Sequence, residues 1–238
     1  MNKNGIEADL AHQNRIWRHY QNIHPESFKN AEPRMDYIIR QILKKSCSKK
    51  PCVLNIGAGS GYLENRLRQL GTDIHTMDPD EMTVRRLSEN GFNSHWGYIE
   101  KMPFDGGQFD FVIASEVLEH LNKHQFNQGL KEVFRMMKPN GWFIGTVPFN
   151  EDLVLNHVIC PDCGHLFHRW GHVLSFNCRT LNHAMAPFFE KILIKKTAFI
   201  KKKGIGWTGT VKSIVRLILA RFGSAIASPN IFFMAQKR

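Results

Sequence analysis

Hydrophobic positions in the middle of the chain fall into short apolar runs separated by amphipathic stretches. The runs have the length of strands, and in the stretches between them apolar residues recur three to four positions apart, which is helical spacing. We expect strands at residues 52–56, 73–77, 109–114 and 142–147. Strands that alternate with helices predict right-handed βαβ units and a mostly parallel α/β sheet with helices on both faces.

The two ends of the chain depart from this alternation. Apolar residues before position 50 keep helical spacing alone, whereas two more strand-like runs lie at 188–200 and 230–235. A segment rich in Cys and His precedes these last runs. The expected units are a helical cap over 1–50, a sheet core over 51–150, a Cys/His-rich insertion over 151–186, and the last strands with an inserted basic helix over 187–238.

Composition adds a strong charge asymmetry to this picture. The chain has 238 residues, a formal net charge of +11 and 42% hydrophobic residues, a content that argues against disorder. Residues 191–238 hold 11 basic side chains and no acidic one, so the excess charge belongs to the C-terminal fifth. No export signal and no uninterrupted apolar run of membrane-spanning length is visible. We therefore expect a cytoplasmic protein with reduced cysteines.

Three closely spaced glycines follow the first expected strand. Gly57, Gly59 and Gly61 lie between that strand and a helix, where an open α/β sheet binds its ligands. Glycine lets the backbone approach a ligand closely, and the helix N-terminus favours a negative group. The dinucleotide fingerprint G-x-G-x-x-G would place its third glycine at position 62. Tyr62 stands there instead, and the third glycine, Gly61, comes one residue early. Asp78 ends the second expected strand and is placed to hold a ribose diol.

These features belong to an ordered set of motifs. Residues 53–61, 78–79, 97–104, 109–112 and 138–141 resemble the motifs of class I S-adenosylmethionine-dependent methyltransferases. The resemblance covers about residues 35–150. It implies a Rossmann-like methyltransferase sheet, mostly parallel with an antiparallel strand near the C-terminus, and S-adenosylmethionine as the cofactor. The cofactor-binding residues that it implies are Asn55, Gly57, Gly59, Gly61, Asp78, Glu100 and Ser115.

Two of these positions depart from the usual family pattern. Asn55 stands where the family usually has an acid, at a position that the resemblance places in contact with the loop or with the cofactor amino group. Tyr98 stands where an adenine-binding Asp is common, so Glu100 or a backbone group is expected to take that contact.

The segment after the fourth expected strand carries the candidate catalytic residues. Residues 115–120 resemble the E-x-x-E-H segment of ubiquinone-biosynthesis O-methyltransferases, in which two Glu and one His are linked to a divalent metal. Here the matching residues are Glu116, Glu119 and His120. His120 is a candidate base with Glu119 beside it, since an imidazole titrates near working pH. The alternative is that the segment only caps the following helix, as similar segments do in many methyltransferases.

The Cys/His-rich insertion carries a spacing typical of a zinc site. Cys160, Cys163, His168 and His172 lie within thirteen residues, and a C-x-x-C turn presents two thiolates to one ion. The stretch resembles an insertion in a subset of bacterial methyltransferases, placed where the fold usually builds its substrate cover. Structural zinc is the expectation. His157, His165 and Cys178 are nearby competitors for a ligand position. The alternatives to zinc are free cysteines, histidines that hydrogen-bond within a lid and, less favoured without a thioredoxin context, a redox cysteine pair.

The basic C-terminal segment predicts an amphipathic helix. Val211, Ile214, Val215, Ile218 and Phe222 share one helical face, after Lys201–Lys203 and Trp207. Such a helix can rest on an anionic membrane surface, which would place the protein peripherally on the inner membrane face. It could instead contact RNA phosphates, or pack as a lid over the active site. No RNA-binding module is recognisable, so nucleic acid is the less favoured partner.

Taken together, the motifs predict a methyltransferase that acts on a small-molecule, lipid or glycan-intermediate acceptor, with oxygen as the methylated atom. One alternative is an RNA or protein methyltransferase that docks through the basic segment. Another is a binding module without catalysis that keeps the fold. Salt-sensitive RNA affinity would favour the first alternative, and a lack of cofactor binding the second.

Overall fold

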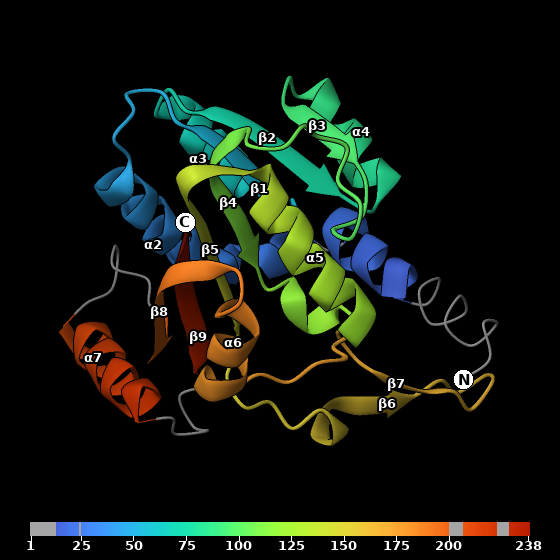
Figure 1. The fold of residues 1–238 in the computed structure, drawn as a ribbon. Helices are drawn as coiled ribbons and strands as arrows, with labels where there is room; N and C mark the ends of the chain where they lie inside the picture. The colour runs from blue at the N-terminus through green and yellow to red at the C-terminus, as the bar shows by residue number, and fades with distance from the viewer. Residues whose placement is uncertain (1–12, 24, 200–206, 223–228) are drawn as a thin grey trace.

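A mixed β-sheet forms the centre of the molecule (Figure 1). The computed structural model describes residues 13–23, 25–199, 207–222 and 229–238. Within these ranges a seven-stranded sheet has the order β3-β2-β1-β4-β5-β9-β8. Its strands are β1 (Cys52–Ile56), β2 (Asp73–Asp78), β3 (Asn93–Trp96), β4 (Phe109–Ser115), β5 (Met137–Pro148), β8 (Phe189–Thr197) and β9 (Asn230–Lys237).

Strand direction confirms the predicted sheet. The pairs from β3 to β5 are parallel, while β9 is antiparallel to both β5 and β8. Parallel neighbours need crossover connections, and the chain makes them with helices. The helices are α2 (Glu32–Lys45), α3 (Tyr62–Gln69), α4 (Glu81–Glu89), α5 (Lys123–Met136), α6 (Cys178–Met185) and α7 (Trp207–Arg221). Shorter helical turns are η1 (His19–Ile23), η2 (Pro25–Ala31), η3 (Leu118–His120) and η4 (Val154–Asn156).

Alternating side chains of the strands build two buried layers. In β1, Val53 packs with α2 and α3 on one face, and Leu54 packs with α5 and α6 on the other. Helix α2 contributes Ile38 and Ile42, both fully buried, as its helical spacing predicts. Helix α5 begins at a capping box in which Asn122 and Gln125 bond reciprocally, so its start is fixed close to the end of β4.

Several elements of the structure were not predicted from the sequence. Strand β3 is a short edge strand of polar residues with no alternating apolar pattern. The Cys/His-rich insertion contains a hairpin of β6 (His157–Ile159) and β7 (Leu166–His168), followed by α6. These strands span three residues each, too few for a periodicity to be recognised.

Helix α7 lies against β8 at the edge of the sheet (Figure 1). Its buried contact is made by Ala220 against Ala198, whereas Ile214, Ile218 and Phe222 are 51%, 52% and 78% exposed. The apolar face expected from the sequence is therefore open rather than packed as a lid. Lys201–Lys203 lie outside the described residues, as does the side chain of Trp207. No helix in the described part of the chain has the length and apolarity needed to cross a bilayer.

Gly145 allows β5 to lie between its two neighbouring strands. A Cβ at this position would stand 2.0 Å from the Ala114 carbonyl oxygen and 2.4 Å from the Phe233 ring. We expect Gly145→Ala to lower the free energy of unfolding by about 3 kcal/mol or more, because backbone and ring must both shift. Gly106→Ala, whose Cβ would meet nothing closer than 3.4 Å, should change it by no more than about 1 kcal/mol. Denaturant titration of both variants checks this, and equal midpoints would contradict it.

Candidate functional site

The glycine loop joins the carboxyl end of β1 to α3. Gly57, Gly59 and Gly61 all have positive φ, at +82°, +53° and +82°. Side chains there would also collide, since a Cβ at Gly57 would lie 2.8 Å from Val117 and one at Gly61 would lie 2.9 Å from Leu87. At these three positions the left-handed backbone and the close packing of neighbouring side chains both favour glycine.

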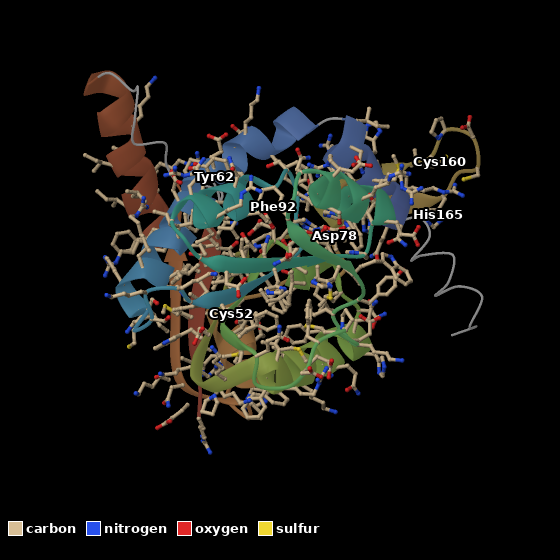
Figure 2. All side chains as sticks on the ribbon, turned by 90° about the horizontal axis from the view of Figure 1, so that it is seen from above. Cys52, Tyr62, Asp78, Phe92, Cys160 and His165 are labelled. Carbon is tan, nitrogen blue, oxygen red and sulfur yellow. The ribbon has the colours of Figure 1, made fainter. Side chains whose placement is uncertain are left out.

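Asp78 ends β2 next to this loop, as the sequence predicts, and Figure 2 shows it at the sheet end beneath α4. Its side chain is 1% exposed. One carboxylate oxygen accepts the Ala58 N–H at 2.9 Å, and the other accepts the Asp80 N–H at 2.9 Å. Burial raises the pKa of Asp78 to about 6, and these hydrogen bonds only partly offset that rise.

An N-terminal segment covers the loop and Asp78. Residues 13–23 are helical and lie across the carboxyl ends of the strands (Figure 1). Gln21 donates to the Asp78 carboxylate at 3.2 Å, and Arg18 and Asn22 each donate to Asp80 at 2.9 Å. Burial opposes ionisation of Asp80, but these donors outweigh it and lower its pKa. Sequence patterns could not reveal this cover, because no local spacing relates residue 21 to residue 78.

Asn55, in β1, hydrogen-bonds to the glycine loop. Its amide donates to the Gly57 carbonyl at 3.3 Å and to Glu64 at 2.6 Å. Glu64 is fully buried in α3, where it also accepts the Thr76 hydroxyl at 2.9 Å, and burial raises its pKa. Asn55 thus contacts the loop although it is not the acid usual in the family. Glu64 was missed by the sequence reasoning.

Three further predicted residues lie near the ends of β3 and β4: Ser115, Glu116 and Glu100. Ser115 ends β4 and shares a hydrogen bond with Thr146. Glu116 has a left-handed backbone, with φ 57°, and its carboxylate accepts donors from Thr146 at 2.8 Å and from Asn230 at 3.1 Å. Glu100 lies between β3 and β4 and accepts the Gln125 amide at 3.2 Å. Ser115 and Glu116 therefore meet at the Thr146 hydroxyl, whereas Glu100 has a separate contact with Gln125.

Glu119 and His120 lie in η3, directly after β4. The side chain of Glu119 is 0% exposed, and burial, followed by the charge of Glu116, raises its pKa well above the ordinary range. His120 approaches the Trp17 indole nitrogen at 3.2 Å. Burial, followed by the charge of His172, lowers the pKa of His120 to about 3, so its imidazole is neutral at physiological pH.

The structure does not gather the four residues predicted to hold zinc. Cys160 and Cys163 lie at the turn of the β6–β7 hairpin, which protrudes away from Asp78 in Figure 2. His168 and His172 lie at the other end of the hairpin, where each is paired with Glu151. The hairpin separates the two pairs because an extended strand carries its residues about 3.3 Å apart. Zinc held by all four ligands stays a prediction.

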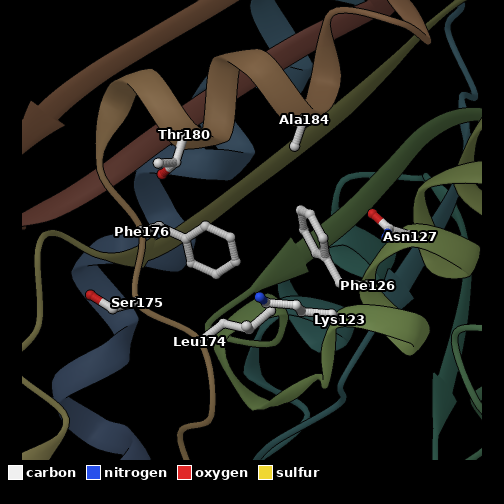
Figure 3. Close-up of a pocket in the computed structure, with 8 residues that line it drawn as sticks. All are labelled: Lys123, Phe126, Asn127, Leu174, Ser175, Phe176, Thr180 and Ala184. Carbon is white, nitrogen blue, oxygen red and sulfur yellow. The ribbon is translucent and has the colours of Figure 1, made fainter.

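A pocket of about 240 Å³ lies between α5, α6 and the segment that precedes α6 (Figure 3). The Phe126 and Phe176 rings are 5.4 Å apart between centroids, and Lys123 reaches toward them. None of the predicted cofactor residues lines this pocket, so it is separate from the glycine loop.

The loop and Asp78 fit the group that the sequence implies. S-adenosylmethionine offers a ribose diol, which donates hydrogen bonds to a carboxylate, and a charged amino-acid end that can approach backbone groups closely. Asp78 provides the carboxylate, and the three left-handed glycines provide backbone free of side chains. S-adenosylmethionine would therefore be held by the loop and Asp78, provided that Gln21 releases the carboxylate.

Comparison with protein families identifies a methyltransferase domain over residues 8–188. Among curated proteins, the chain is similar to the ubiquinone biosynthesis O-methyltransferase of Pseudomonas fluorescens, with 32% identity over 118 residues, covering 45% of this chain and 49% of that protein. The mitochondrial enzyme of the same name from Schizosaccharomyces pombe is 27% identical over 117 residues, covering 45% and 42%. The chain spans less than half the length of the curated relatives it matches.

Solved structures share the fold at low identity. The Burkholderia thailandensis 1,6-didemethyltoxoflavin-N1-methyltransferase superposes with a TM-score of 0.66 at 14% identity, covering 100% of this chain and 91% of that one. The PH0226 protein from Pyrococcus horikoshii gives a TM-score of 0.60 at 18% identity, covering 93% and 96%. These likenesses confirm the predicted Rossmann-like methyltransferase sheet.

The buried charge of Asp78 makes stability depend on pH. Its folded pKa of about 6 lies above the ordinary value of 3.8, so the folded state binds the proton more tightly and loses stability as pH rises between these values. Asp78→Asn removes this titration. The unsubstituted protein should lose about 2–3 kcal/mol of unfolding free energy between about pH 4 and about pH 8 that the variant does not lose. The stability difference between the two proteins should therefore change by that amount in favour of the variant. Denaturant titrations at both pH values check this, and a constant difference would contradict it.

Proposed function

We propose, because this chain belongs to the methyltransferase domain family, that it transfers the methyl group of S-adenosylmethionine to a hydroxyl oxygen of a small-molecule or lipid-linked acceptor. The observation that carries the proposal is the left-handed glycine loop after β1 beside the buried Asp78 carboxylate at the end of β2. Neighbouring parallel strands end at the same edge of the sheet, which brings the loop and the Asp78 carboxylate into direct contact.

The N-terminal segment has a defined part in cofactor binding. Asp78 is fully covered, and Gln21 donates to the oxygen that also accepts the Ala58 N–H. The ribose hydroxyls replace the Gln21 amide as donors to this carboxylate. Phe28, whose ring would lie 3.2 Å from a Cβ at Gly59, covers the loop from the same side. Residues 13–23 and 25–31 therefore shift when the cofactor binds, and afterwards exclude water from it.

The relatives support a small-molecule acceptor and oxygen as the methylated atom. Two of them are named for O-methylation in ubiquinone biosynthesis, and a demethylmenaquinone methyltransferase of Chlorobaculum parvum is 28% identical over 96 residues, covering 39% of each chain. S-adenosylmethionine supplies an electrophilic methyl group on a sulfonium. The chain has to align the acceptor oxygen with that carbon, and alignment alone can contribute roughly 7–11 kcal/mol.

We assign the acceptor side of the reaction to Glu119 and His120. His120 keeps a ring lone pair at physiological pH, because burial lowers its pKa to about 3. That lone pair accepts a hydrogen bond from the acceptor hydroxyl and takes its proton as the oxygen forms its bond to the methyl carbon, while the cofactor sulfur leaves as a neutral thioether. The N-terminal segment connects the two halves of the site, since Gln21 contacts Asp78 and Trp17, one helical turn earlier, contacts His120.

Helix α7 supports delivery of the acceptor from a membrane surface. Its exposed side chains include Ile214, Ile218 and Phe222 as well as Lys212 and Arg216. A helix with apolar residues and cations both open to solvent can insert its apolar side chains among lipids while its cations meet anionic headgroups.

Cofactor binding tests the central proposal. We expect Asp78→Ala to weaken S-adenosylmethionine binding by about tenfold or more in calorimetric titration of the full chain, because the ribose loses its charged acceptor. Asp73→Ala is the matched control, since Asp73 begins the same strand and its side chain is 44% exposed. Equal affinity of Asp78→Ala and the unsubstituted protein would remove Asp78 from the site. An absence of binding to the unsubstituted protein would sink the function as a whole.

Membrane contact can be tested separately. We expect Ile214→Glu with Ile218→Glu to weaken binding to vesicles containing anionic phospholipid by about tenfold or more, measured by sedimentation, because the apolar face is lost. Leu43→Glu in α2 is the matched control, because Leu43 is 52% exposed, as is Ile218. Unchanged vesicle binding by the double variant, or salt-sensitive binding to RNA in place of vesicles, would contradict membrane docking.

A further inference from the structure

Two histidines and a buried carboxylate meet between η3 and the segment after β7. Glu119, His120 and His172 each offer one ligand atom, and these atoms lie within 4.8 Å of one another. The His120 and His172 rings stand edge to face with centroids 4.7 Å apart. His172 comes from the Cys/His-rich insertion, 52 positions along the chain from His120, so the grouping exists only in the folded protein.

Glu119 has no hydrogen-bond partner for either carboxylate oxygen among the residues that the structure describes. Its side chain is nonetheless 0% exposed. A buried carboxylate without a donor is strongly unfavourable, and the remedies are a proton or a cation. The backbone holds Glu119 in place, because its carbonyl oxygen accepts the Val173 N–H at 2.7 Å and the Leu174 N–H at 2.9 Å. The backbone that carries the unpartnered carboxylate is therefore held in place.

The hydrogen bonds of His172 leave it a free lone pair. Its Nδ1 lies 2.5 Å from a Glu151 carboxylate oxygen. Because a carboxylate accepts hydrogen bonds, Nδ1 carries the proton and Nε2 keeps its lone pair. A carboxylate that orients the non-ligating N–H of an imidazole is the usual outer partner of a metal-bound histidine.

His120 can adopt the same arrangement. Its Nδ1 lies 3.2 Å from both the Trp17 indole nitrogen and the Gly171 carbonyl oxygen. The indole can only donate and the carbonyl can only accept. A protonated Nδ1 therefore pairs with Gly171, and an unprotonated Nδ1 pairs with Trp17. When Nδ1 donates to Gly171, the lone pair lies on Nε2 and a backbone carbonyl orients the ring.

The neighbouring groups are already engaged. His168 accepts the backbone N–H of His172 at 3.0 Å on Nδ1, which places its proton on Nε2; that N–H lies 3.4 Å from Glu151 without a hydrogen bond to it. A neutral imidazole has a single lone pair, so His168 has none left for an ion. The carboxylate of Glu116 is held by Thr146 and Asn230.

We propose that Glu119, His120 and His172 bind one divalent transition-metal ion, with Zn²⁺ as the reference ion. Two imidazoles and one carboxylate are a donor set that such ions take, and three protein ligands leave a position open to an oxygen. Bound there, the ion would take the Nε2 lone pair of His120, so that the ion in place of this lone pair would orient the acceptor oxygen and activate it as a Lewis acid. The site differs from the four-ligand set predicted from the sequence, because it uses neither the cysteines nor His168. It also differs from the E-x-x-E-H resemblance, because His172 takes the place of Glu116.

Metal binding without cofactor tests this site. The full chain, stripped of metal and then loaded with Zn²⁺ and dialysed, should retain about one ion per chain. We expect Glu119→Gln and His172→Ala to weaken zinc binding by at least about tenfold in competition with a chelating dye. His157→Ala, an exposed histidine on the same hairpin, and the pair Cys160→Ser with Cys163→Ser should retain the ion. Circular dichroism confirms that each variant is folded.

Substitution of Co²⁺ for zinc gives a second readout that needs no variant. A site of two imidazoles and one carboxylate gives visible d–d bands without thiolate-to-cobalt charge transfer in the near ultraviolet. A thiolate band, together with loss of the ion in the cysteine pair, would move the metal to the hairpin turn and overturn the proposal. Retention of zinc by both Glu119→Gln and His172→Ala would overturn it as well, as would an unsubstituted chain that binds no ion.

Discussion

Burial of the Asp78 carboxylate constrains the whole carboxyl edge of the sheet. A charge at this depth needs hydrogen-bond donors, and they come from the glycine loop, from the turn into α4 and from the N-terminal segment. Each of these segments is thereby fixed relative to β2. The residual cost, visible as the raised pKa of Asp78, is energy that a cofactor ribose can recover on binding. The stability of the fold and the proposed binding of the cofactor thus both depend on the Asp78 carboxylate.

The N-terminal segment joins the two ends of the proposed site, the cofactor end at Asp78 and the acceptor end at His120. Gln21 lies on Asp78 and Trp17 lies on His120, so movement of this one helical segment changes the surroundings of both groups. Removal of the Trp17 contact would favour the His120 tautomer that donates to Gly171. If cofactor binding displaces Gln21 from Asp78, the same movement shifts Trp17 and so changes which nitrogen of His120 carries the proton.

The Cys/His-rich insertion has two ends with different environments. At the turn, Cys160 and Cys163 lie close together, and the N–H groups of Cys163 and Asp162 lower the pKa of the Cys160 thiol. At the base, Glu151, His168 and His172 form a hydrogen-bonded cluster against His120. The base joins the insertion to the proposed acceptor side, whereas the turn lies away from Asp78.

The sequence by itself determined the parts of this protein that depend on neighbours along the chain. Strand periodicity, the glycines after β1 and the acid at the end of β2 are local features, and parallel strands bring their ends to one edge whatever surrounds them. Strand β3 escaped prediction because an edge strand of polar residues carries no apolar alternation. Tertiary structure alone decided that Gln21 covers Asp78, that Glu119 lacks a donor, and that His172 rather than a cysteine faces His120. These contacts join residues about 50 or more positions apart, and packing between elements sets such distances without leaving a spacing in the sequence.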